Sequence, residues 1–541
     1  MSGDLVFYIW FLFRLLFIAL IAVYLVSGVD DLFLDLVHYV RVIFRRLFRR
    51  RVIQPLTSEQ LHSVPEKPIA IMIPAWDESS VIGRMLLNTL NTADYRNFCI
   101  FVGVYPNDEA TTLEVERVRE IYHNVEVVVT PAPGPTNKAD CLNWIYQGIL
   151  VYEKENGVRF EIFLMQDSED VVHPLSLRYC NYLIPRMHFI QLPVFPLEAP
   201  WYDFVTGVYK DEFAENHTKD LRARETLAAC LPSAGVGTAL SRYALDYLAK
   251  DRRNQIFDIA TLTEDYALGV TLEDLPGKKI FLQQSVDRIV RKRRWLTGEE
   301  AQVRVSEPVA TREFFPNTFR AAVRQKSRWI LGIGLQGWSI GWSGSLGGNY
   351  CLYRDRKAVF TNIVNVLGYA VALMGLGLWI FNATHPDTWI PPLIEPGEIY
   401  AALLIAVLGI FCWRLLNRAV AVARIYGFVD GLLSVPRLFV GNVINFCATV
   451  VAIRRFIAAK ITGRVPPREK KEHAWPTEQQ LRGYHRKLGD LLLEHRLVTT
   501  GQLEQALNEQ ERTGRKLGEI LVSMGALWEE DLVFTLARQR R

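Results

Sequence analysis

The sequence predicts an α/β domain joined to transmembrane helices, followed by a small all-α domain built from a tandem repeat. Short apolar strands alternate with helical segments from residue 67, long apolar runs lie on either side of that region, and one pattern occurs twice near the C-terminus. Half of the 541 residues are hydrophobic and 22% are charged, which indicates soluble parts joined to membrane segments. The net charge of +4 is too small over this length to indicate nucleic acid binding.

The seven cysteines are scattered and lack metal-ligand spacing, so we expect reduced thiols in a cytosolic or membrane setting. The chain is expected to divide into six parts. They are a transmembrane helix (1–30), an amphipathic interface helix and linker (31–66), a cytosolic α/β domain (67–335), a transmembrane hairpin with an interfacial or re-entrant helix (336–465), a connector (466–484) and the repeat domain (485–541).

The first apolar run, Leu5 to Val29, contains one charged residue, Arg14. It is longer than a signal-peptide core and has no small-residue cleavage pattern, so a retained helix is expected. The next segment has apolar residues at helical spacing and arginines clustered at its end, which suits the cytoplasmic headgroup region. A basic solvated helix is the weaker interpretation, because Phe44 and Phe48 accompany the arginines.

Two further spans are expected at Val359 to Phe381 and Tyr400 to Leu416. The loop between them has no Lys or Arg and arginines follow the second span, so the hairpin projects outward. A third stretch, Leu432 to Ile453, has basic residues on both sides. One crossing there would leave the polar tail outside, so we expect an interfacial or re-entrant helix starting near Pro436. The predicted topology has three spans, an external N-terminus and both soluble regions in the cytosol, with the exact number of crossings left open.

The α/β region is expected to form a largely parallel sheet that binds ligands at the carboxyl ends of its strands. The expected strands are Ile69 to Ile73, Cys99 to Val104, Val125 to Val129 and Ile162 to Gln166, and the expected helices are Glu78 to Leu90 and Ala139 to Glu153.

Five polar clusters follow one another along the chain, and the first and third come directly after expected strands. They are I-P-A-W-D-E (73–78), N-K-A-D (137–140), Q-D-S-E-D (166–170), T-E-D (263–265) and Q-K-S-R-W (325–329). Together they suit a site for a nucleotide diphosphate, a divalent metal ion, a general base and an acceptor beside a membrane.

Asp167 and Glu169 form a D-x-E pair on the loop after an apolar strand, and such hard oxygen ligands suit Mg²⁺ or Mn²⁺. An acidic triplet alone is more often a solvated turn, but its position after the strand F-L-M-Q favours the metal site. Lys138 opens an expected helix and is placed to reach a phosphate, although alone it would be an ordinary surface lysine.

Asp265 is the candidate general base that deprotonates an acceptor hydroxyl, and its alternative is a helix cap. The segment A-G-V-G-T (234–238) offers backbone near the acceptor, or is a plain turn. Arg328 suits a leaving diphosphate and Trp329 suits a sugar ring. The alternative for Q-K-S-R-W is an amphipathic helix near the bilayer.

The five clusters resemble those of glycosyltransferase family 2, in its membrane-embedded branch with cellulose, chitin and hyaluronan synthases. The resemblance runs from about Pro68 to the Leu432–Ile453 helix. It implies a GT-A (Rossmann-like) fold, a UDP-sugar donor, Mg²⁺ or Mn²⁺, and inverting transfer in one displacement.

The resemblance assigns roles to single positions. Near uridine it would place Asp77 or Glu78 and Asn107 or Asp108, and near a phosphate Lys138. At the metal and diphosphate it would place Asp167 and Glu169, and at the acceptor Asp265 with Glu264. Along the diphosphate and acceptor side it would place Gln325, Arg328 and Trp329. The chain departs from the family pattern in W-D-E, in P-N-D and in the Glu of its D-x-E pair.

The C-terminal pattern Lys487 to Gln510 recurs as Lys516 to Gln539, and it predicts two copies of a small helical unit. From the residues alone this is a helical pair, and the alternative function is the docking of a protein. It also resembles the tandem cyclic di-GMP-binding domain of type II secretion and pilus ATPases. The residues that this resemblance implies in nucleotide binding are Arg486, Lys487, Leu488, Gly489, Leu503, Leu507 and Gln510 in the first copy, and Arg515, Lys516, Leu517, Gly518, Gly525, Leu532, Leu536 and Gln539 in the second. Where the second copy has Gly525, the first has Arg496.

The connector weakly resembles a gating loop with the pattern W-x-K-T-x-H, in which Lys470 and His473 match and Arg468 and Lys471 depart. Such a loop would carry the nucleotide state of the tail to the catalytic cleft.

The whole arrangement most resembles the phage adsorption protein B family of Gram-negative bacteria. That resemblance implies an inner-membrane enzyme that makes or helps export a surface polysaccharide under cyclic di-GMP control, with an outer-membrane partner. This chain is expected to be shorter than the family at its C-terminus. An N-acetylated hexosamine is the expected sugar, on the resemblance alone.

Two other functions remain open from the sequence: a catalytically weak membrane receptor or scaffold that binds cyclic di-GMP, and a transferase that adds one sugar to a lipid phosphate. Also open are the sugar and acceptor, processive or single addition, the direction of regulation and the oligomeric state.

Overall fold

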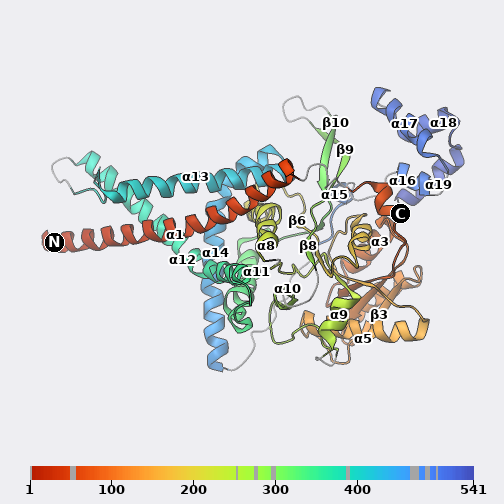
Figure 1. Cartoon of the computed structure of the whole chain (residues 1–541), viewed down its shortest axis with the longest axis horizontal. Coiled ribbons are helices and arrows are strands. Elements are labelled where there is room, and N and C mark those ends of the chain that lie inside the picture. Colours follow the sequence, from red (N-terminus) through yellow and green to blue (C-terminus); the bar gives the residue numbers. More distant parts are fainter. Residues whose placement is uncertain are drawn as a thin grey trace.

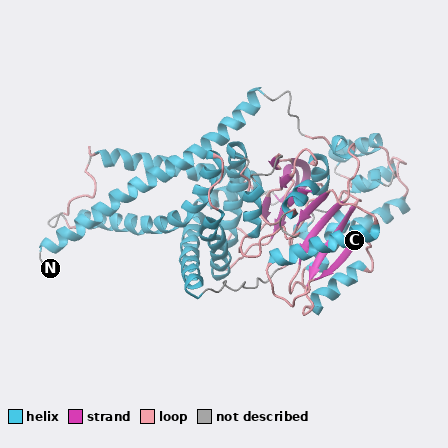
Figure 2. Ribbon diagram, turned by 60° about the horizontal axis from the view of Figure 1, so that its bottom comes forward, coloured by secondary structure: helices cyan, strands magenta, loops and turns pink. Residues whose placement is uncertain are grey.

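The computed structural model describes residues 3–48, 56–228, 230–250, 254–272, 278–293, 300–385, 390–395, 397–462, 474–481, 488–494, 497–513 and 515–540. Long helices form an arm on one side, an α/β domain lies in the middle, and a small helical domain lies at the far end from the tip of the arm (Figure 1). Among the described residues, strands lie only in the middle part (Figure 2). This arrangement confirms the predicted fold class.

The α/β domain is built on a seven-stranded sheet with the order β3-β2-β1-β4-β7-β5-β8. The strands are β1 (Ile69–Pro74), β2 (Phe98–Val104), β3 (Val125–Val129), β4 (Ile162–Met165), β5 (Phe189–Gln191), β7 (Thr238–Ser241) and β8 (Lys279–Phe281). All neighbours pair in parallel except β7, which is antiparallel to both β4 and β5. The four predicted strands are confirmed to within one residue at each end.

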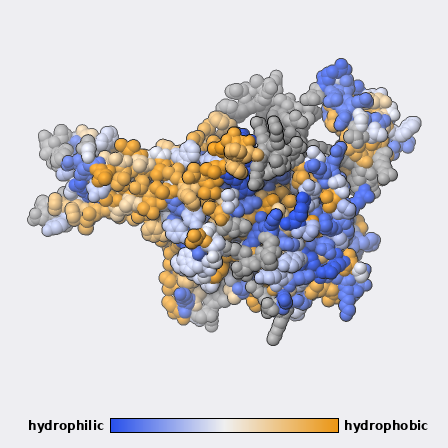
Figure 3. Space-filling model, in the orientation of Figure 1, coloured by the Kyte–Doolittle hydropathy of each residue, from blue (hydrophilic) through white to orange (hydrophobic). Residues whose placement is uncertain are grey.

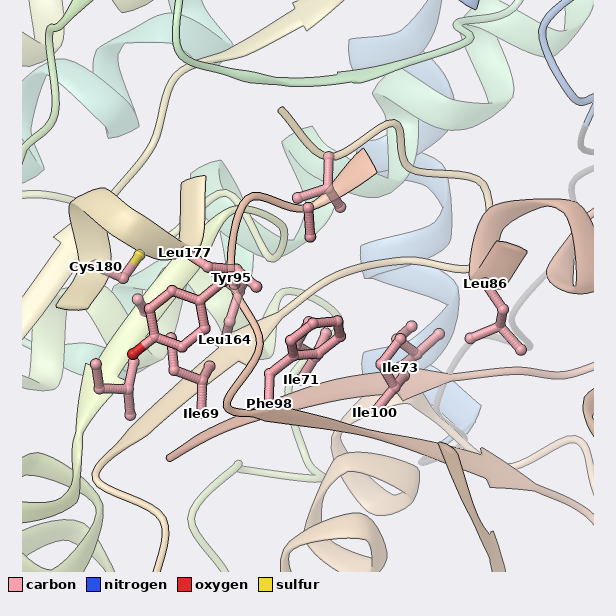
Figure 4. Packing of buried hydrophobic residues seen from close by; sticks show 14 of the residues in the cluster. Ile69, Ile71, Ile73, Leu86, Tyr95, Phe98, Ile100, Leu164, Leu177 and Cys180 are labelled. Carbon is pink, nitrogen blue, oxygen red and sulfur yellow. The ribbon is translucent and has the colours of Figure 1, made fainter. Parts of the chain in front are cut away.

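Alternating side chains of β1 fill a hydrophobic core on each side of the sheet, as expected for a central strand. Ile69, Ile71 and Ile73 join one core, whose packing around Phe98, Ile100 and Leu164 is shown in Figure 4. Ala70 and Met72 join the other. The helices beside the sheet are α3 (Ile82–Thr92), α4 (Glu109–Arg119), α5 (Lys138–Asn156), α6 (Ser176–Leu183) and α9 (Arg242–Ala249).

The predicted helix Glu78 to Leu90 begins too early, because α3 starts at Ile82. Asp77 has a left-handed φ of 58°, which breaks the chain direction after β1 and puts a turn before the helix. Lys138 is the first residue of α5, as predicted, and the side chain of Asn137 caps this helix.

The rest of the domain connects the sheet to the membrane helices. Its elements are α2 (Ser58–His62), β6 (Val194–Pro196), α7 (Phe204–Glu215), the π-helix η1 (Asn216–Asp220), α8 (Leu221–Ala228), α10 (Glu264–Thr271), β9 (Ser285–Arg293), β10 (Glu300–Pro308), β11 (Thr311–Glu313), α11 (Phe319–Trp329), the π-helix η3 (Ile330–Leu335) and the 3₁₀ helix η4 (Gln336–Ile340).

Within the described part of the chain, four helices are long and apolar enough to cross a membrane: α1 (Gly3–Phe48), α12 (Leu346–Thr384), α13 (Ile399–Tyr426) and α14 (Phe428–Thr462). The chain is therefore a membrane protein. The transmembrane helix and interface helix predicted at the N-terminus form one continuous helix, α1. The viewed surface of the arm made by α1, α12 and α13 is largely hydrophobic, whereas that of the α/β domain is largely hydrophilic (Figure 3).

The N-terminal part of α1 lies beside the loop between α12 and α13. Arg14 pairs with Glu398 at 2.6 Å, and the indole of Trp10 donates to the carbonyl of Pro391 at 2.9 Å. At the other end of the arm, Asp30 of α1 pairs with Arg354 of α12. The N-terminus and the hairpin loop thus lie at the same end of the arm, as the predicted topology requires.

Helix α14 runs across the axes of α1, α12 and α13 rather than along them (Figure 1). Its residues Arg437, Gly441 and Ile444 are buried, while Phe439 and Val443 are exposed. Pro436 lies inside the helix, whose length and composition alone would also permit a crossing. The direction of α14 favours the predicted interfacial helix over a fourth span, and this remains a prediction.

The C-terminal domain contains α16 (Leu488–Glu494), α17 (Thr500–Thr513), α18 (Leu517–Ser523) and α19 (Glu529–Arg540). Its two halves make matching contacts. A Cβ on Gly489 would meet the Leu503 side chain at 3.0 Å, and a Cβ on Gly518 would meet Leu532 at 2.6 Å. The predicted helical repeat is therefore confirmed, with a core of its own that contains Leu492, Leu503, Ile520 and Leu521.

Candidate active site

Three of the five clusters meet at the carboxyl end of β4. The amino group of Lys138 lies 2.5 Å from Asp167 Oδ1 and donates to the carbonyl of Gly235 at 3.1 Å. Asp265 lies against the same glycine, because a Cβ built on Gly235 would be 2.6 Å from Asp265 Oδ2. Parallel strands and the loops after them bring Lys138, Asp167 and Asp265 together although they are far apart in sequence.

The electrostatics of this group follow from burial and close charges. Burial opposes the charged form of Lys138, but Asp167, Glu264 and Asp265 outweigh it and raise the pKa of the amino group. Burial raises the pKa of Asp265 above its ordinary value of 3.8, while Lys138 and Arg328 oppose that rise. Lys138 is therefore a firmly charged group, and Asp265 is a more basic carboxylate than an exposed aspartate.

The first cluster and the segment around Asp108 form the next part of the site. The amide of Asp77 donates to Asp108 Oδ2 at 2.5 Å, and the amide of Glu78 donates to the hydroxyl of Thr111 at 2.9 Å. Asn107 exchanges hydrogen bonds with the backbone of Gly134. The structure thus brings Asp77, Glu78, Asn107 and Asp108 together at the ends of β1 and β2.

The D-S-E-D loop is held from inside by its last residue. Asp170 is fully buried, and its Oδ2 accepts from the amide of Asp167 at 2.7 Å. Burial, with the nearby Asp167, Glu313 and Glu169, raises the pKa of Asp170 well above 3.8. Asp170 therefore holds the backbone of the loop, a role that the sequence did not reveal. The only signal in the sequence was its position at the end of the acidic cluster.

The residues Asp167 and Glu169 fit a hard divalent cation, because they offer carboxylate oxygens on a loop beside Lys138. Among the residues that the structure describes, no group of three or more His, Cys, Asp or Glu side chains is arranged to hold a metal ion by itself. A cation here would therefore be completed by substrate phosphates and water, as is usual for Mg²⁺.

Helix α10 places the T-E-D cluster. Thr263 precedes the helix, but its side chain makes no cap hydrogen bond, and a Cβ on Gly332 of η3 would lie 2.4 Å from it. The start of α10 thus packs directly on the segment after Q-K-S-R-W. Glu264 is buried, and Asp265 Oδ1 accepts from the amide of Tyr266 at 2.7 Å.

Helix α11 carries Q-K-S-R-W on the other side of Asp265. Trp329 packs edge-to-face on Tyr209 with ring centres 6.0 Å apart, and also contacts Phe213 and Phe315. Arg328 is close enough to Asp265 to lower its pKa. Gln325 Oε1 is buried and has no hydrogen-bond partner among the described residues, a state that calls for an explanation.

Replacing Gly235 by alanine is expected to lower kcat/KM by about tenfold or more. The glycine has a φ of 79°, and the new methyl group would press on the carboxylate of Asp265. Ala234→Gly, on the adjacent residue, is the control. Steady-state kinetics would test this, and an unchanged kcat/KM in Gly235→Ala would contradict the geometry.

A general base at Asp265 would have to be deprotonated, and burial raises its pKa, so the acid limb of kcat/KM is expected above pH 3.8. Lys138→Met removes the cation that lowers this pKa. The pKa of Asp265 then rises further, so the acid limb should move to higher pH as the rate falls overall. A pH profile of kcat/KM checks this, and a shift to lower pH would contradict it.

The residues proposed for cyclic di-GMP divide between core and surface. Gly489, Leu503 and Gly518 are buried in the repeat domain, whereas Leu507 is 41% exposed. Leu488, Leu517, Leu532 and Leu536 are partly buried. On the surface, Arg515 and Lys516 are exposed, and Gln510 donates to the carbonyl of Arg515 at 3.2 Å. Gly525 has a φ of 68°. Arg486, Lys487 and the side chain of Gln539 lie outside the described residues.

The residues Lys470 and His473 of the expected gating loop also lie outside the described part of the chain. The end of the connector reaches the α/β domain. Trp475 and Leu481 pack in one apolar cluster with Val171, which directly follows the D-S-E-D loop. Gln480 donates to the carbonyl of Glu198 at 3.0 Å.

The family model described as "Glycosyltransferase like family 2" matches residues 65–332. Bacteriophage adsorption protein B of Escherichia coli K12 is 39% identical over 528 residues, covering 97% of this chain and 70% of that protein. Bacteriophage N4 adsorption protein B of E. coli O157:H7 matches with the same figures.

Among solved structures, the mannosyltransferase PcManGT of Pyrobaculum calidifontis, in complex with GDP-Man and Mn²⁺, is similar with a TM-score of 0.47 and 13% identity. That match covers 81% of this chain and 99% of that one. Glucosyl-3-phosphoglycerate synthase of Mycobacterium tuberculosis, in complex with Mn²⁺, UDP-glucose and phosphoglyceric acid, has a TM-score of 0.24, with 17% identity over 36% of this chain and 65% of that one.

Proposed function

The chain belongs to the bacteriophage adsorption protein B family and carries a glycosyltransferase family 2 domain, and on this premise we propose that it transfers a sugar from a UDP-sugar with inversion. The observation that carries the proposal is the meeting of Lys138, Asp167 and Asp265 around Gly235. This meeting supports the proposal, because a single displacement needs a base beside groups that bind the diphosphate.

In the proposed reaction, the carboxylate of Asp265 accepts the proton of an acceptor hydroxyl as its oxygen attacks the anomeric carbon. The bond from that carbon to the diphosphate breaks, and UDP leaves with the electron pair. Lys138 and Arg328 place positive charge toward the leaving group, while Gln325 offers its free carbonyl oxygen to an acceptor hydroxyl. Trp329 supplies an aromatic face beside the acceptor.

We propose that Asp167 and Glu169 hold Mg²⁺ or Mn²⁺. When bound, the ion supplies positive charge that stabilises the leaving diphosphate. Asp77, Glu78, Asn107 and Asp108 are proposed to contact the uridine end of the donor.

The proposed product is a surface polysaccharide containing an N-acetylhexosamine, made at the bacterial inner membrane and exported with an outer-membrane partner. This part rests on the resemblance to the family. The catalytic and C-terminal domains are proposed to be cytosolic.

The C-terminal domain is proposed to bind cyclic di-GMP and to activate transfer. The exposed Arg515 and Lys516 suit the phosphates of this ligand, and the repeat offers two related surfaces. The contact of Trp475 and Leu481 with Val171 supplies a route from the connector to the D-S-E-D loop.

The test is UDP release by the detergent-solubilised protein with a panel of UDP-sugars and Mg²⁺ or Mn²⁺, with and without cyclic di-GMP. We expect turnover with one donor class, dependent on metal and increased by cyclic di-GMP. Arg515→Ala with Lys516→Ala should abolish the increase without lowering basal turnover. If no donor is turned over but cyclic di-GMP binds tightly, the proposed enzymatic function is overturned, and the receptor or scaffold function is favoured instead. Transfer to a polyprenyl phosphate alone would favour the single-sugar lipid transferase.

A further inference from the structure

Lys326, inside Q-K-S-R-W, is a buried lysine that touches two other helices. Its amino group donates to Glu212 Oε2 of α7 at 2.5 Å and to Asn445 Oδ1 of α14 at 2.9 Å. The side-chain amide of Asn445 donates in turn to Glu212 Oε1 at 3.1 Å. The three side chains form a closed triangle of hydrogen bonds that joins α11, α7 and α14.

The triangle lies on the face of α11 that packs on α7. Lys326 is three residues before Trp329, so the two share a helix face. The Lys326 amino group lies 5.0 Å from the ring centre of Tyr209, and Trp329 packs on the same ring. Gln325 and Arg328 are also three residues apart and share the adjacent face. Fixing Lys326 therefore fixes the rotation of α11 and the direction of Gln325 and Arg328.

The ion pair between Lys326 and Glu212 costs desolvation free energy to bury, and this cost argues for a specific role. Lys326 is 3% exposed, and burial lowers its pKa while the charge of Glu212 opposes that effect. Replacing such a buried pair by apolar groups is often neutral for stability. Stability alone therefore gives little reason for the pair, although removing Lys326 alone takes a partner from the Glu212 carboxylate.

We propose that Lys326 is a positioning residue, which through Glu212 and Asn445 holds Gln325 and Arg328 in place relative to α14. The role of these two side chains in transfer rests on the proposed function. Helix α14, which precedes the connector, thereby helps to set the geometry of the active site through the hydrogen bond between Lys326 and Asn445.

Lys210 offers a matched control. It is 2% exposed, pairs with Asp430 of α14 at 2.7 Å and lies 4.6 Å from the ring centre of Tyr426. Lys210 is thus a lysine of nearly equal burial that contacts α14, as Lys326 does. Unlike Lys326, it lies on α7, and neither Asp430 nor Tyr426 is on α11.

The test compares Lys326→Met with Lys210→Met in the full chain by hydrogen exchange of residues 319–335, which does not depend on turnover. Lys326→Met is expected to raise amide exchange in this segment about tenfold, whereas Lys210→Met should leave it within about twofold of wild type. Equal exchange in this segment in both variants would overturn the proposal.

Turnover gives the second measurement, with UDP binding used to count folded sites. Lys326→Met should lower kcat per site by about 10²-fold with donor KM nearly unchanged, and Asn445→Leu should follow it. Lys210→Met should keep kcat. An unchanged kcat in Lys326→Met would contradict positioning. If the wild type turns over no donor, the proposed function fails separately, and hydrogen exchange still decides whether Lys326 positions α11.

Discussion

Asp265→Asn is expected to lower kcat by about 10² to 10⁴-fold, the usual contribution of a general base. The substitution keeps the shape of the side chain but removes the group that accepts the proton. Lys138 keeps its contact with Asp167 at 2.5 Å, so the donor side of the site should persist. We therefore expect UDP to bind nearly as tightly as to the wild type, with the loss confined to transfer.

The measurements are kcat for UDP release and the dissociation constant of UDP with Mn²⁺. Asp246→Asn is a suitable control, because Asp246 is a half-exposed carboxylate that pairs with Arg242 of its own helix. Its kcat should equal that of the wild type. If Asp265→Asn retains kcat within about tenfold, Asp265 is not the base, since that is below the range for base catalysis.

The site could be predicted in part because its chemistry lies in short polar clusters directly after strong apolar strands. Asp167 follows β4 and Lys138 opens α5, so parallel-sheet geometry alone predicts that both lie near one edge. The sequence offered the backbone of A-G-V-G-T (234–238) near the acceptor, but the contact of Gly235 with the Asp265 carboxylate could not be predicted, because it depends on how the antiparallel strand β7 and helix α10 return to that edge.

Other features depended on contacts between distant segments. The sequence assigned no role to Lys326 within Q-K-S-R-W, since nothing nearby in sequence indicates its partners Glu212 and Asn445. The late start of α3 depends on the backbone of Asp77, whose amide is held by Asp108. The continuity of α1 was hidden by a change in composition, because the helix leaves the apolar region and continues along α8, where Arg41 pairs with Glu225 at 2.7 Å.

Arg437→Met is expected to destabilise the protein by about 3–5 kcal/mol, the usual cost of breaking a buried ion pair from one side. Arg437 and Asp211 are each 1% exposed, and the guanidinium donates to both carboxylate oxygens at 2.8 and 2.9 Å. Gly207 lets α7 approach, because a Cβ there would lie 2.5 Å from Arg437. The pair thus joins α7 to α14, and its loss leaves a carboxylate buried at that contact.

The pH dependence of stability identifies this cause. Burial raises the pKa of Asp211 to about 7 although Arg437 lowers it, so without the arginine the pKa should be higher still. A carboxyl with a raised folded-state pKa favours the unfolded state as pH rises above its ordinary value near 4. The two proteins should lose stability in parallel between about pH 4 and 7, and the melting temperature of Arg437→Met in detergent should fall further below the wild type as the pH rises above about 7. Adding Asp211→Asn should restore most of the loss and abolish this additional slope. If the double variant is as unstable as Arg437→Met, lost packing rather than the buried charge is the cause.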